Sequence, residues 1–418
     1  MTAELCGPGS RMVVAKEFVV TFPVLQYAGF ALGYAFIIVE SAVIRNILKP
    51  ILVIASLLFS TSSAMAFTLI VLPGEEATVP SKSITDATTY VTQVQPLIRA
   101  IRGRLLNYRD QQGADTVAHY DHMLAANSYF GSASDGPLLL VAIDDSVEGV
   151  GGGDGSGKGG FWFNSAYTNI RNDFERTKFD GHTQGILAGV DYTSADKFVL
   201  GLAANFEVSQ FNTDFNLGNE KTTGYTVTPY FAWLLSDNWT VDLSLGYGDF
   251  DTKQDRTFLD LTLVPLPANV AIDSEFSSTR EFAAMNLTHA AGWGSWYFTQ
   301  SVGVLGLTRE QDEYIESDGT VVAGSRESIT QWNAGAEVAY SPGGGEVFLN
   351  AIYEKTRNAP EVTFLVGEQP VNDPDSVLAS TGWRYFGKTV TANFAFSTRL
   401  DQEDVTEYGV SATIYVGL

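Results

Sequence analysis

The chain contains few charged residues and almost no cysteine. Only 17% of its 418 residues are charged, and its single cysteine is Cys6. One cysteine excludes both a disulfide framework within the chain and a zinc site built from several cysteines. Basic residues are also scarce, because 25 Lys and Arg stand against 48 Asp and Glu, for a net charge of −23. This acidic balance argues against nucleic acid as a partner, since phosphate binding needs a basic surface.

Aromatic residues and glycine are plentiful by comparison. The chain has 26 Phe, 18 Tyr, 7 Trp and 40 Gly, while hydrophobic residues make up an ordinary 45%. That share argues against a protein built from many membrane-spanning helices. Low charge combined with many aromatics is unusual for an acidic soluble protein, so the arrangement of these residues along the chain has to explain it.

The first 66 residues have the composition of a targeting segment. An apolar run from Ile51 to Phe59 follows Arg45 and Lys49, and the segment ends in Ala64-Met65-Ala66. A basic flank, a short apolar region and an A-x-A-like end are the parts of a secretory signal peptide. We therefore expect recognition by the general secretion machinery and cleavage after Ala66. The alternative is a two-helix membrane anchor, because the run 18–39 is long enough to span a bilayer.

From Phe161 onward, apolar residues alternate with small or polar residues. In the segment 197–209, Phe198 and Leu200 fall on one face, whereas Asn205 and Glu207 fall on the other. Strict alternation indicates β-strands with one apolar face, and runs of about ten residues match transmembrane strands. Aromatic residues gather near the predicted strand ends: Phe198, Trp233, Trp239 and Tyr247. This pattern is typical of an outer-membrane barrel with aromatic girdles at both membrane interfaces.

The connections between the predicted strands alternate in length. Short turns are expected at 194–196, 236–238, 292–294 and 341–343, and long polar connections at 210–222, 251–277, 310–327 and 357–375. Such barrels have short periplasmic turns and longer outer loops. The strand count depends on the C-terminal part, because a single hairpin turning at Asp401 gives eleven strands and a further turn at Gly387-Lys388 gives twelve. An even number favours twelve.

The sequence thus predicts an all-β fold, an antiparallel up-and-down transmembrane β-barrel of about 12 strands with a short N-terminal helical segment. The predicted strands are 161–171, 181–192, 197–209, 223–235, 238–250, 278–291, 295–308, 328–340, 345–356, 376–386, 389–400 and 406–418. The predicted organisation is a targeting segment at 1–66, a helical segment at 67–148, a glycine-rich linker at 149–160 and the barrel at 161–418.

The last predicted strand has an apolar face that continues to the last residue. Its members are Tyr408, Val410, Ala412, Ile414, Val416 and Leu418. A chain that ends inside an amphipathic strand resembles the C-terminal signal that the barrel assembly machinery recognises. Such signals usually end in Phe, whereas this chain ends in Leu.

Five short sequences together resemble the translocator domain of autotransporters. They are GFWF at 160–163, GILAGVDY at 185–192, FVLGLAA at 198–204, DLSLGYG at 242–248 and YGVSA at 408–412. The resemblance covers roughly residues 160–418 and implies a twelve-stranded barrel in the outer membrane of a Gram-negative bacterium. The family usually has a long passenger domain before the barrel, and residues 67–160 are too few for one.

Residues 83–111 are predicted to form a helix with Ser83 or Thr85 as the N-cap and Pro96 as a kink. The stretch 97–109 is the most basic part of the chain and contains Arg99, Arg102, Arg104 and Arg109. One interpretation is a helix that occupies the barrel lumen, where these arginines meet inward acidic residues such as Asp191, Glu207, Asp242 and Glu337. The alternative is a periplasmic amphipathic helix with solvated charges. A second helix near 114–130 and a strand at 138–143 are also predicted.

The sequence offers no convincing catalytic or cofactor site. The run at 152–158 is similar to a phosphate-binding loop, but Gly159 stands where magnesium binding needs Ser or Thr. His119 and His122 lack an evident third metal ligand, and His289 falls on the lipid-facing side of its strand. We therefore expect a monomer that is not an enzyme, has no cofactor or metal, and contacts outer-membrane lipid. The leading hypothesis is an autotransporter-type barrel with a minimal passenger; the alternative is a stand-alone pore or a structural or adhesive envelope protein that secretes nothing.

Overall fold

The computed structural model describes 68–71, 81–82, 85, 89, 92–102, 158–193, 198–236, 238–260, 268–341, 345–358, 361–364, 370, 374–386 and 390–417. All of these residues lie in one compact unit, Phe59–Leu418. The predictions for the targeting segment, the second helix at 114–130 and the strand at 138–143 fall outside the described residues. Among the residues described, no helix is long and apolar enough to cross a membrane.

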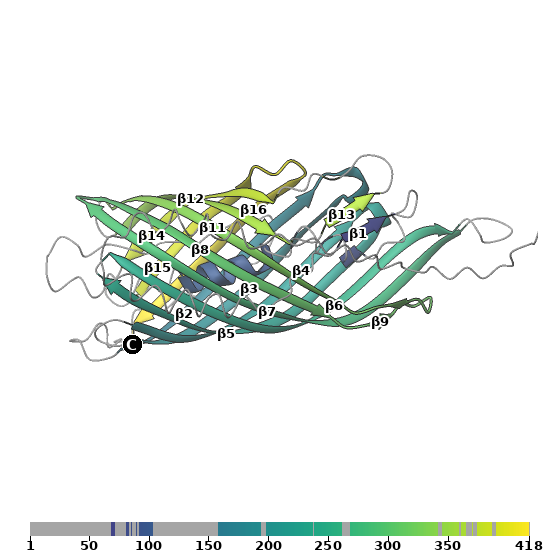
Figure 1. Ribbon diagram of the computed structural model, residues 1–418, viewed down its shortest axis with the longest axis horizontal. Coiled ribbons are helices and arrows are strands. Elements are labelled where there is room, and N and C mark those ends of the chain that lie inside the picture. The colour runs from purple at the N-terminus through teal and green to yellow at the C-terminus, as the bar shows by residue number, and fades with distance from the viewer. Residues whose placement is uncertain are drawn as a thin grey trace, which may run out of the picture. The chain divides into compact units, whose positions relative to one another are not determined.

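Twelve antiparallel strands close into a barrel, as the alternation predicted (Figure 1). They are β2 (Lys158–Asn172), β3 (Phe179–Thr193), β4 (Phe198–Thr213), β5 (Gly218–Ser236), β6 (Trp239–Asp260), β7 (Ala268–Trp293), β8 (Trp296–Gln311), β11 (Ser325–Tyr340), β12 (Gly345–Arg357), β14 (Asp375–Phe386), β15 (Val390–Leu400) and β16 (Val405–Gly417). Each of these strands pairs with the next barrel strand along the chain, and β16 pairs with β2 to close the ring. Because β14 and β15 are separate strands, the count of twelve is confirmed.

Six smaller elements lie in the connections or before the barrel. The 3-10 turns η3 (Glu175–Thr177) and η4 (Asp214–Asn216) join β2 to β3 and β4 to β5. A small hairpin of β9 (Tyr314–Ile315) and β10 (Val321–Val322) lies between β8 and β11. A parallel pair joins β1 (Thr68–Val71) to β13 (Glu361–Phe364), which lies between β12 and β14. We call the end of the barrel that carries these connections the long-loop end, and the opposite end the short-turn end.

The two faces of the wall differ as the alternation predicted. On β4, Phe198, Leu200 and Phe206 are 40–56% exposed, whereas Asn205 and Glu207 are at most 8% exposed. The exposed apolar face is the outer face of the barrel, and the buried polar face is the inner face. On β16 the even-numbered residues from Tyr408 to Val416 are more exposed than the odd-numbered ones between them. His289 lies on the outer face beside Trp239, with ring centroids 4.7 Å apart.

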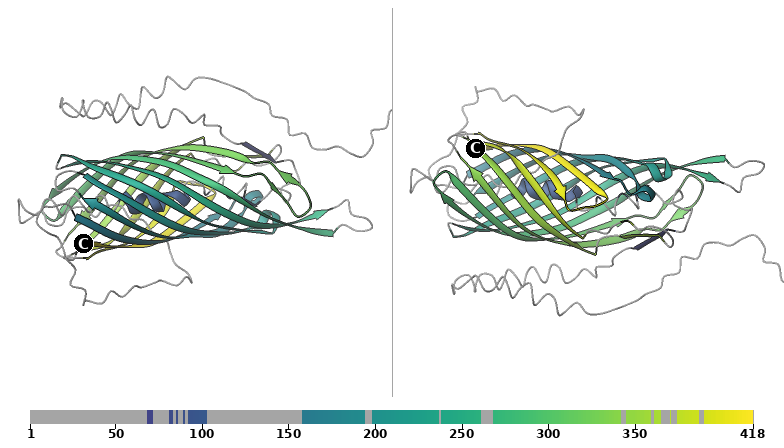
Figure 2. Two further views of the ribbon diagram at one scale, coloured as in Figure 1. Left: turned by 90° about the horizontal axis from the view of Figure 1, so that it is seen from below. Right: turned by 90° about the horizontal axis from the view of Figure 1, so that it is seen from above.

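Two of the expected long connections are shorter than predicted. Residues 210–222 were expected to be a long polar connection, but β4 continues to Thr213 and β5 begins at Gly218. Residues 251–277 were expected to be a long polar loop, but β6 continues to Asp260 and β7 begins at Ala268. The two strands remain paired in register to that point, so the hairpin extends beyond the neighbouring strands (Figure 2). In this hairpin, the inward residues Phe250 and Thr252 alternate with outward acidic residues. This alternation extends the strand beyond the apolar residues on which the prediction was based. Similarly, β2 begins at Lys158, inside the predicted linker.

Glycines on the inner face make room for two large aromatic side chains. Trp162 and Tyr230 are almost completely buried, and the indole N–H of Trp162 donates a 2.8 Å hydrogen bond to the Tyr230 hydroxyl. A Cβ added at Gly189 would lie 2.3 Å from the Trp162 ring, and one at Gly201 would lie 2.1 Å from the Tyr230 ring. Glycine is therefore required at these positions for the rings to lie flat across the neighbouring strand.

This packing predicts different outcomes for two similar substitutions on β3. Gly189→Ala should destabilise the barrel by about 1–3 kcal/mol, because the buried Trp162 has little room to move. Gly185→Ala is the matched control, since its added Cβ would lie 3.2 Å from the nearest atom, the Asn205 amide oxygen. Urea unfolding of the two variants in lipid vesicles measures the difference. Equal unfolding midpoints would contradict the role assigned to Gly189.

Candidate functional site

The region before the barrel contains a helix at 92–102, which we call the arginine helix. Helical residues also occur at 81–82, 85 and 89. Within 92–102, Val94 and Ile101 are at most 1% exposed, and Leu97 and Ile98 also belong to the main buried apolar cluster. That cluster includes Trp162 and other apolar side chains of the inner face. The arginine helix is therefore packed against the barrel wall rather than solvated.

Arg99 takes part in a buried network of alternating charges. Its guanidinium Nη2 lies 3.3 Å from Glu354 on β12, and the same carboxylate lies 2.5 Å from Arg399 on β15. Arg399 also donates a 2.8 Å hydrogen bond to Glu407 on β16, which accepts a second one from the Thr92 hydroxyl at 2.9 Å. All four charged side chains are at most 8% exposed. The helix thus contributes one cation and one hydroxyl to a network built mainly by three wall strands.

Arg102 contacts a different part of the wall. Its guanidinium donates a 3.0 Å hydrogen bond to the Thr288 hydroxyl on β7. It also attracts the carboxylate of Asp242 on β6, which accepts a 2.8 Å hydrogen bond from Asn286. Thr288 lies five residues from the last residue of β7, Trp293, so this contact is close to the short-turn end.

The residues before the arginine helix contact the long-loop end. Ser81 is hydrogen-bonded to Thr213 and Asn216 beside η4, at about 3 Å. The Lys82 ammonium lies 2.8 Å from Glu220, and its backbone N–H donates to Gln254 at 3.1 Å. These contacts and those of Arg102 lie toward opposite ends of the barrel. Lys82 and Arg102 therefore contact inner-face residues near opposite ends of the wall strands.

The β9–β10 hairpin adds a polar cluster at the long-loop end. Gln254 donates a 3.0 Å hydrogen bond to the Tyr314 hydroxyl, and Arg256 pairs with Glu316 at 2.5 Å. The Tyr314 ring stacks on Phe276 of β7 with centroids 4.4 Å apart. Burial raises the pKa of Tyr314 to about 12. Gln254 links this hairpin to the backbone of Lys82.

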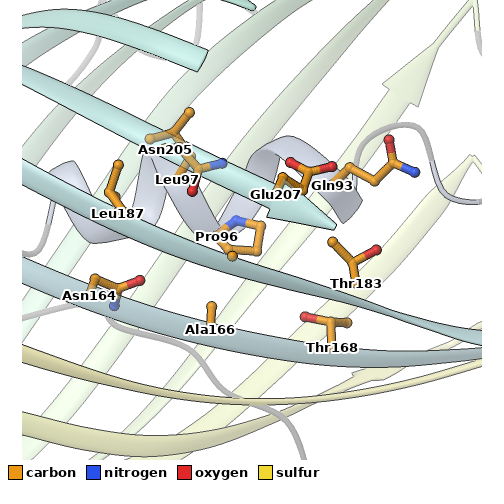
Figure 3. A pocket seen from close by; sticks show the side chains of 11 residues that line it. Gln93, Pro96, Leu97, Asn164, Ala166, Thr168, Thr183, Leu187, Asn205 and Glu207 are labelled. Atoms are coloured by element: carbon orange, nitrogen blue, oxygen red, sulfur yellow. The ribbon is translucent and has the colours of Figure 1, made fainter. Parts of the chain in front are cut away.

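A small cavity separates the arginine helix from β2, β3 and β4 (Figure 3). Its volume is about 20 Å³, enough for a water molecule. Pro96 and Leu97 line it from the helix, and its wall side is mostly polar: Asn164, Thr168, Thr183, Asn205 and Glu207. Glu207 pairs with Arg280 at 3.2 Å through one oxygen, and Arg280 also donates a 2.6 Å hydrogen bond to Gln93. Polar contacts such as that of Gln93 with Arg280 thus lie beside the apolar cluster between helix and wall.

The sequence pattern predicted only part of this arrangement. Of the four acidic residues suggested as partners for the helix, Asp242 interacts with Arg102, but Glu207 pairs with Arg280 and Glu337 with Arg384. Asp191 accepts a hydrogen bond from Tyr230 at 3.0 Å. Glu207 and Glu337 are therefore paired with wall arginines on β7 and β14 rather than with the helix.

Glu354 is a partner of the helix that was not predicted from the sequence. Glu354 is an even number of residues from Glu346 and Asn350 on β12, and both of these face inward. The alternation within 345–356 therefore indicates that Glu354 faces inward as well. Arg104, Arg109, the cleavage site at Ala64 and Ala66, and Leu418 lie outside the described residues. Among the residues described, no cluster of three or more His, Cys, Asp or Glu could hold a metal ion.

The network around Glu354 predicts a large loss of stability on neutralisation. Glu354→Gln leaves Arg99 and Arg399 buried without their shared anion, so we expect a loss of about 3 kcal/mol in the free energy of unfolding. Glu275→Gln is the control, because its pair with Lys253 is about 70% exposed and should contribute at most about 1 kcal/mol. Urea unfolding in lipid vesicles compares the two. A loss at Glu354 as small as that at Glu275 would show that the network does not stabilise the fold.

The solved structures that are similar to this chain include three autotransporter domains. The translocator domain of autotransporter NalP from Neisseria meningitidis is 12% identical, with a TM-score of 0.49 and coverage of 65% of this chain and 90% of that one. The β-domain of the Bordetella autotransporter BrkA is 14% identical, with a TM-score of 0.49 and coverage of 62% and 100%. The transport unit of autotransporter AIDA-I from Escherichia coli is 12% identical, with a TM-score of 0.44 and coverage of 67% and 94%.

The family assignment comes from the sequence. The comparison with curated proteins found no match. The family model described as the autotransporter β-domain matches residues 161–365, which run from β2 to just beyond β13. The twelve-stranded closed barrel is the fold that the resemblance in the sequence led us to expect. The chain therefore carries a β-domain of the autotransporter family, a barrel of the outer membrane of Gram-negative bacteria.

Proposed function

We propose that this protein is a translocator-type barrel whose own N-terminal segment remains in the lumen after export, with only a minimal passenger outside. The observation that carries the proposal is the buried contact of Arg99 with Glu354, together with that of Arg102 with Thr288. Both partners are inner-face residues of strands on different parts of the wall. A helix held from several sides is what a lumen plug requires.

The size of the barrel supports the same proposal. A twelve-stranded barrel leaves room for about one helix and some water. The cavity beside Pro96, between the helix and β2–β4, has a volume of about 20 Å³. We infer that the closed state conducts ions poorly and that any passenger is restricted to residues before Ser81. The alternative, a pore or adhesive envelope protein that secretes nothing, requires residues 67–80 to stay in the periplasm.

The partners follow from the family and the fold. Autotransporter β-domains are inserted into the outer membrane by the barrel assembly machinery, and the outer face described above contacts lipid. We propose that Tyr408, Val410, Ala412, Ile414, Val416 and Leu418 form the signal for that machinery, that export requires cleavage after Ala66, and that the barrel is a monomer. The absence of enzymatic activity stays a prediction.

The plug can be tested by reversing its charges. The double variant Arg99→Glu/Arg102→Glu places carboxylates against Glu354 and Asp242, and burying such like charges should cost at least about 3 kcal/mol per site. We therefore expect a larger single-channel conductance in planar bilayers than for the unmodified chain. Arg326→Glu is the control, because its pair with Glu310 is about 60% exposed and lies on the outer surface. Equal conductance of both variants and the unmodified chain would overturn the proposal.

The location of the N-terminal segment can be tested on intact cells. A protease-sensitive tag inserted near residue 75 should be cleaved by external protease, because Ser81 lies at the long-loop end. The same tag inserted at Asn238, in the turn between β5 and β6, should be cleaved only after the outer membrane is permeabilised. If the tag near residue 75 is also protected until permeabilisation, the segment is periplasmic and the alternative function is favoured.

A further inference from the structure

The loop between β12 and β14 contains a strand that belongs to no part of the barrel wall. This strand, β13, pairs in parallel with β1, the first described element of the chain (Figure 1). The register joins Thr68 to Glu361 and Val71 to Phe364 over all four residues of each strand. The two strands are separated by 289 residues of sequence (361 minus 72), so this is a specific long-range pairing and not a local hairpin.

The position of β13 is determined by the barrel topology. β12 ends at Arg357 and β14 begins at Asp375, and both ends are at the long-loop end. Longer connections of such barrels face the outside of the cell. A strand that pairs with β13 is therefore held on the outer side of the membrane.

A second anchor holds the same segment at the same end. Ser81 is hydrogen-bonded beside η4, between β4 and β5, and Lys82 is paired with Glu220. Around the closed ring, the β12–β14 connection and the β4–β5 connection are six strand positions apart, which is half of the circuit. The N-terminal segment is thus attached to two opposite sides of the long-loop end.

We propose that β13 is a docking strand for the exported N-terminus. Once the N-terminal segment has passed through the barrel, Thr68–Val71 adds to β13 by parallel β-pairing and anchors the segment on the cell surface. Main-chain hydrogen bonds supply the affinity, as in other cases where an extended peptide adds to an exposed strand. The barrel restrains the segment near the loop, so even four residues meet their partner at a high effective concentration. The anchor keeps the arginine helix from sliding back toward the periplasm.

This proposal rests on the proposed function only in requiring that Thr68–Val71 reach the outside. A single variant, Leu69→Cys in a Cys6→Ser background, tests that requirement alone. A membrane-impermeant maleimide should label it on intact cells. Labelling only after permeabilisation would overturn both the docking strand and the exported N-terminus.

The pairing itself is tested with two thiols in register. Leu69→Cys/Val362→Cys places cysteines on directly opposed residues, and neighbouring strands lie at a separation compatible with a disulfide. Leu69→Cys/Asp401→Cys is the control, because Asp401 lies in the connection between β15 and β16 at the same end. After mild oxidation of intact cells, PEG-maleimide labelling with and without prior reduction measures the disulfide. We expect the in-register pair to oxidise about tenfold faster than the control.

The outcomes separate the two ideas. If Leu69→Cys is labelled on intact cells but both double variants oxidise at the same rate, the N-terminus is exported and the docking strand is wrong. Thr363→Pro removes a main-chain donor from the centre of β13, so it should reduce oxidation of the in-register pair to the rate of the control. An unchanged rate in that triple variant would also overturn the proposal, because the disulfide would then form without strand pairing.

Discussion

The structure depends on the requirement that backbone polar groups in a bilayer find partners within the protein. A flat sheet would leave two edges unpaired, so the twelve strands close on themselves through β16 and β2. Closure produces an outer face in contact with lipid and an inner face shielded from it. Every charged residue on the inner face then needs a partner inside the barrel, and this second requirement shapes the interior.

The inner face meets that requirement by pairing arginines with carboxylates of other wall strands. Arg384 lies between Glu337 and Glu346 and over the ring of Phe348, and its side chain is about 1% exposed. Arg399 has the same role between Glu354 and Glu407. The arginine helix joins the second of these networks through Arg99. Arg99 thus pairs with Glu354, whose carboxylate is already oriented by Arg399. The contact of Arg99 therefore needs no additional acidic residue.

The two ends of the barrel carry different kinds of structure. Turns at the short-turn end are brief, whereas the long-loop end carries the extended β6–β7 hairpin, the β9–β10 hairpin and the β1–β13 pair. The polar segment at 81–82 contacts the first of these through Gln254. Because segments before the barrel contact elements of this end, the long loops serve as attachment points for the N-terminal part of the chain as well as surface structures.

The sequence determined the barrel, because strict alternation assigns each residue of a strand to one face and a change of register would expose polar side chains to lipid. It therefore predicted a transmembrane barrel, the outward position of His289 and the inward position of Glu207. The sequence did not determine which charged residues pair. Alternation along a strand shows which face a residue lies on, but not its level along the barrel axis once the strands are tilted. Arg99 meets Glu354, and Glu207 meets Arg280, only because the tilt of the strands brings those levels together. The pairing of Thr68–Val71 with β13 was likewise decided by tertiary structure, because four-residue strands carry too little pattern to identify a partner so distant in sequence.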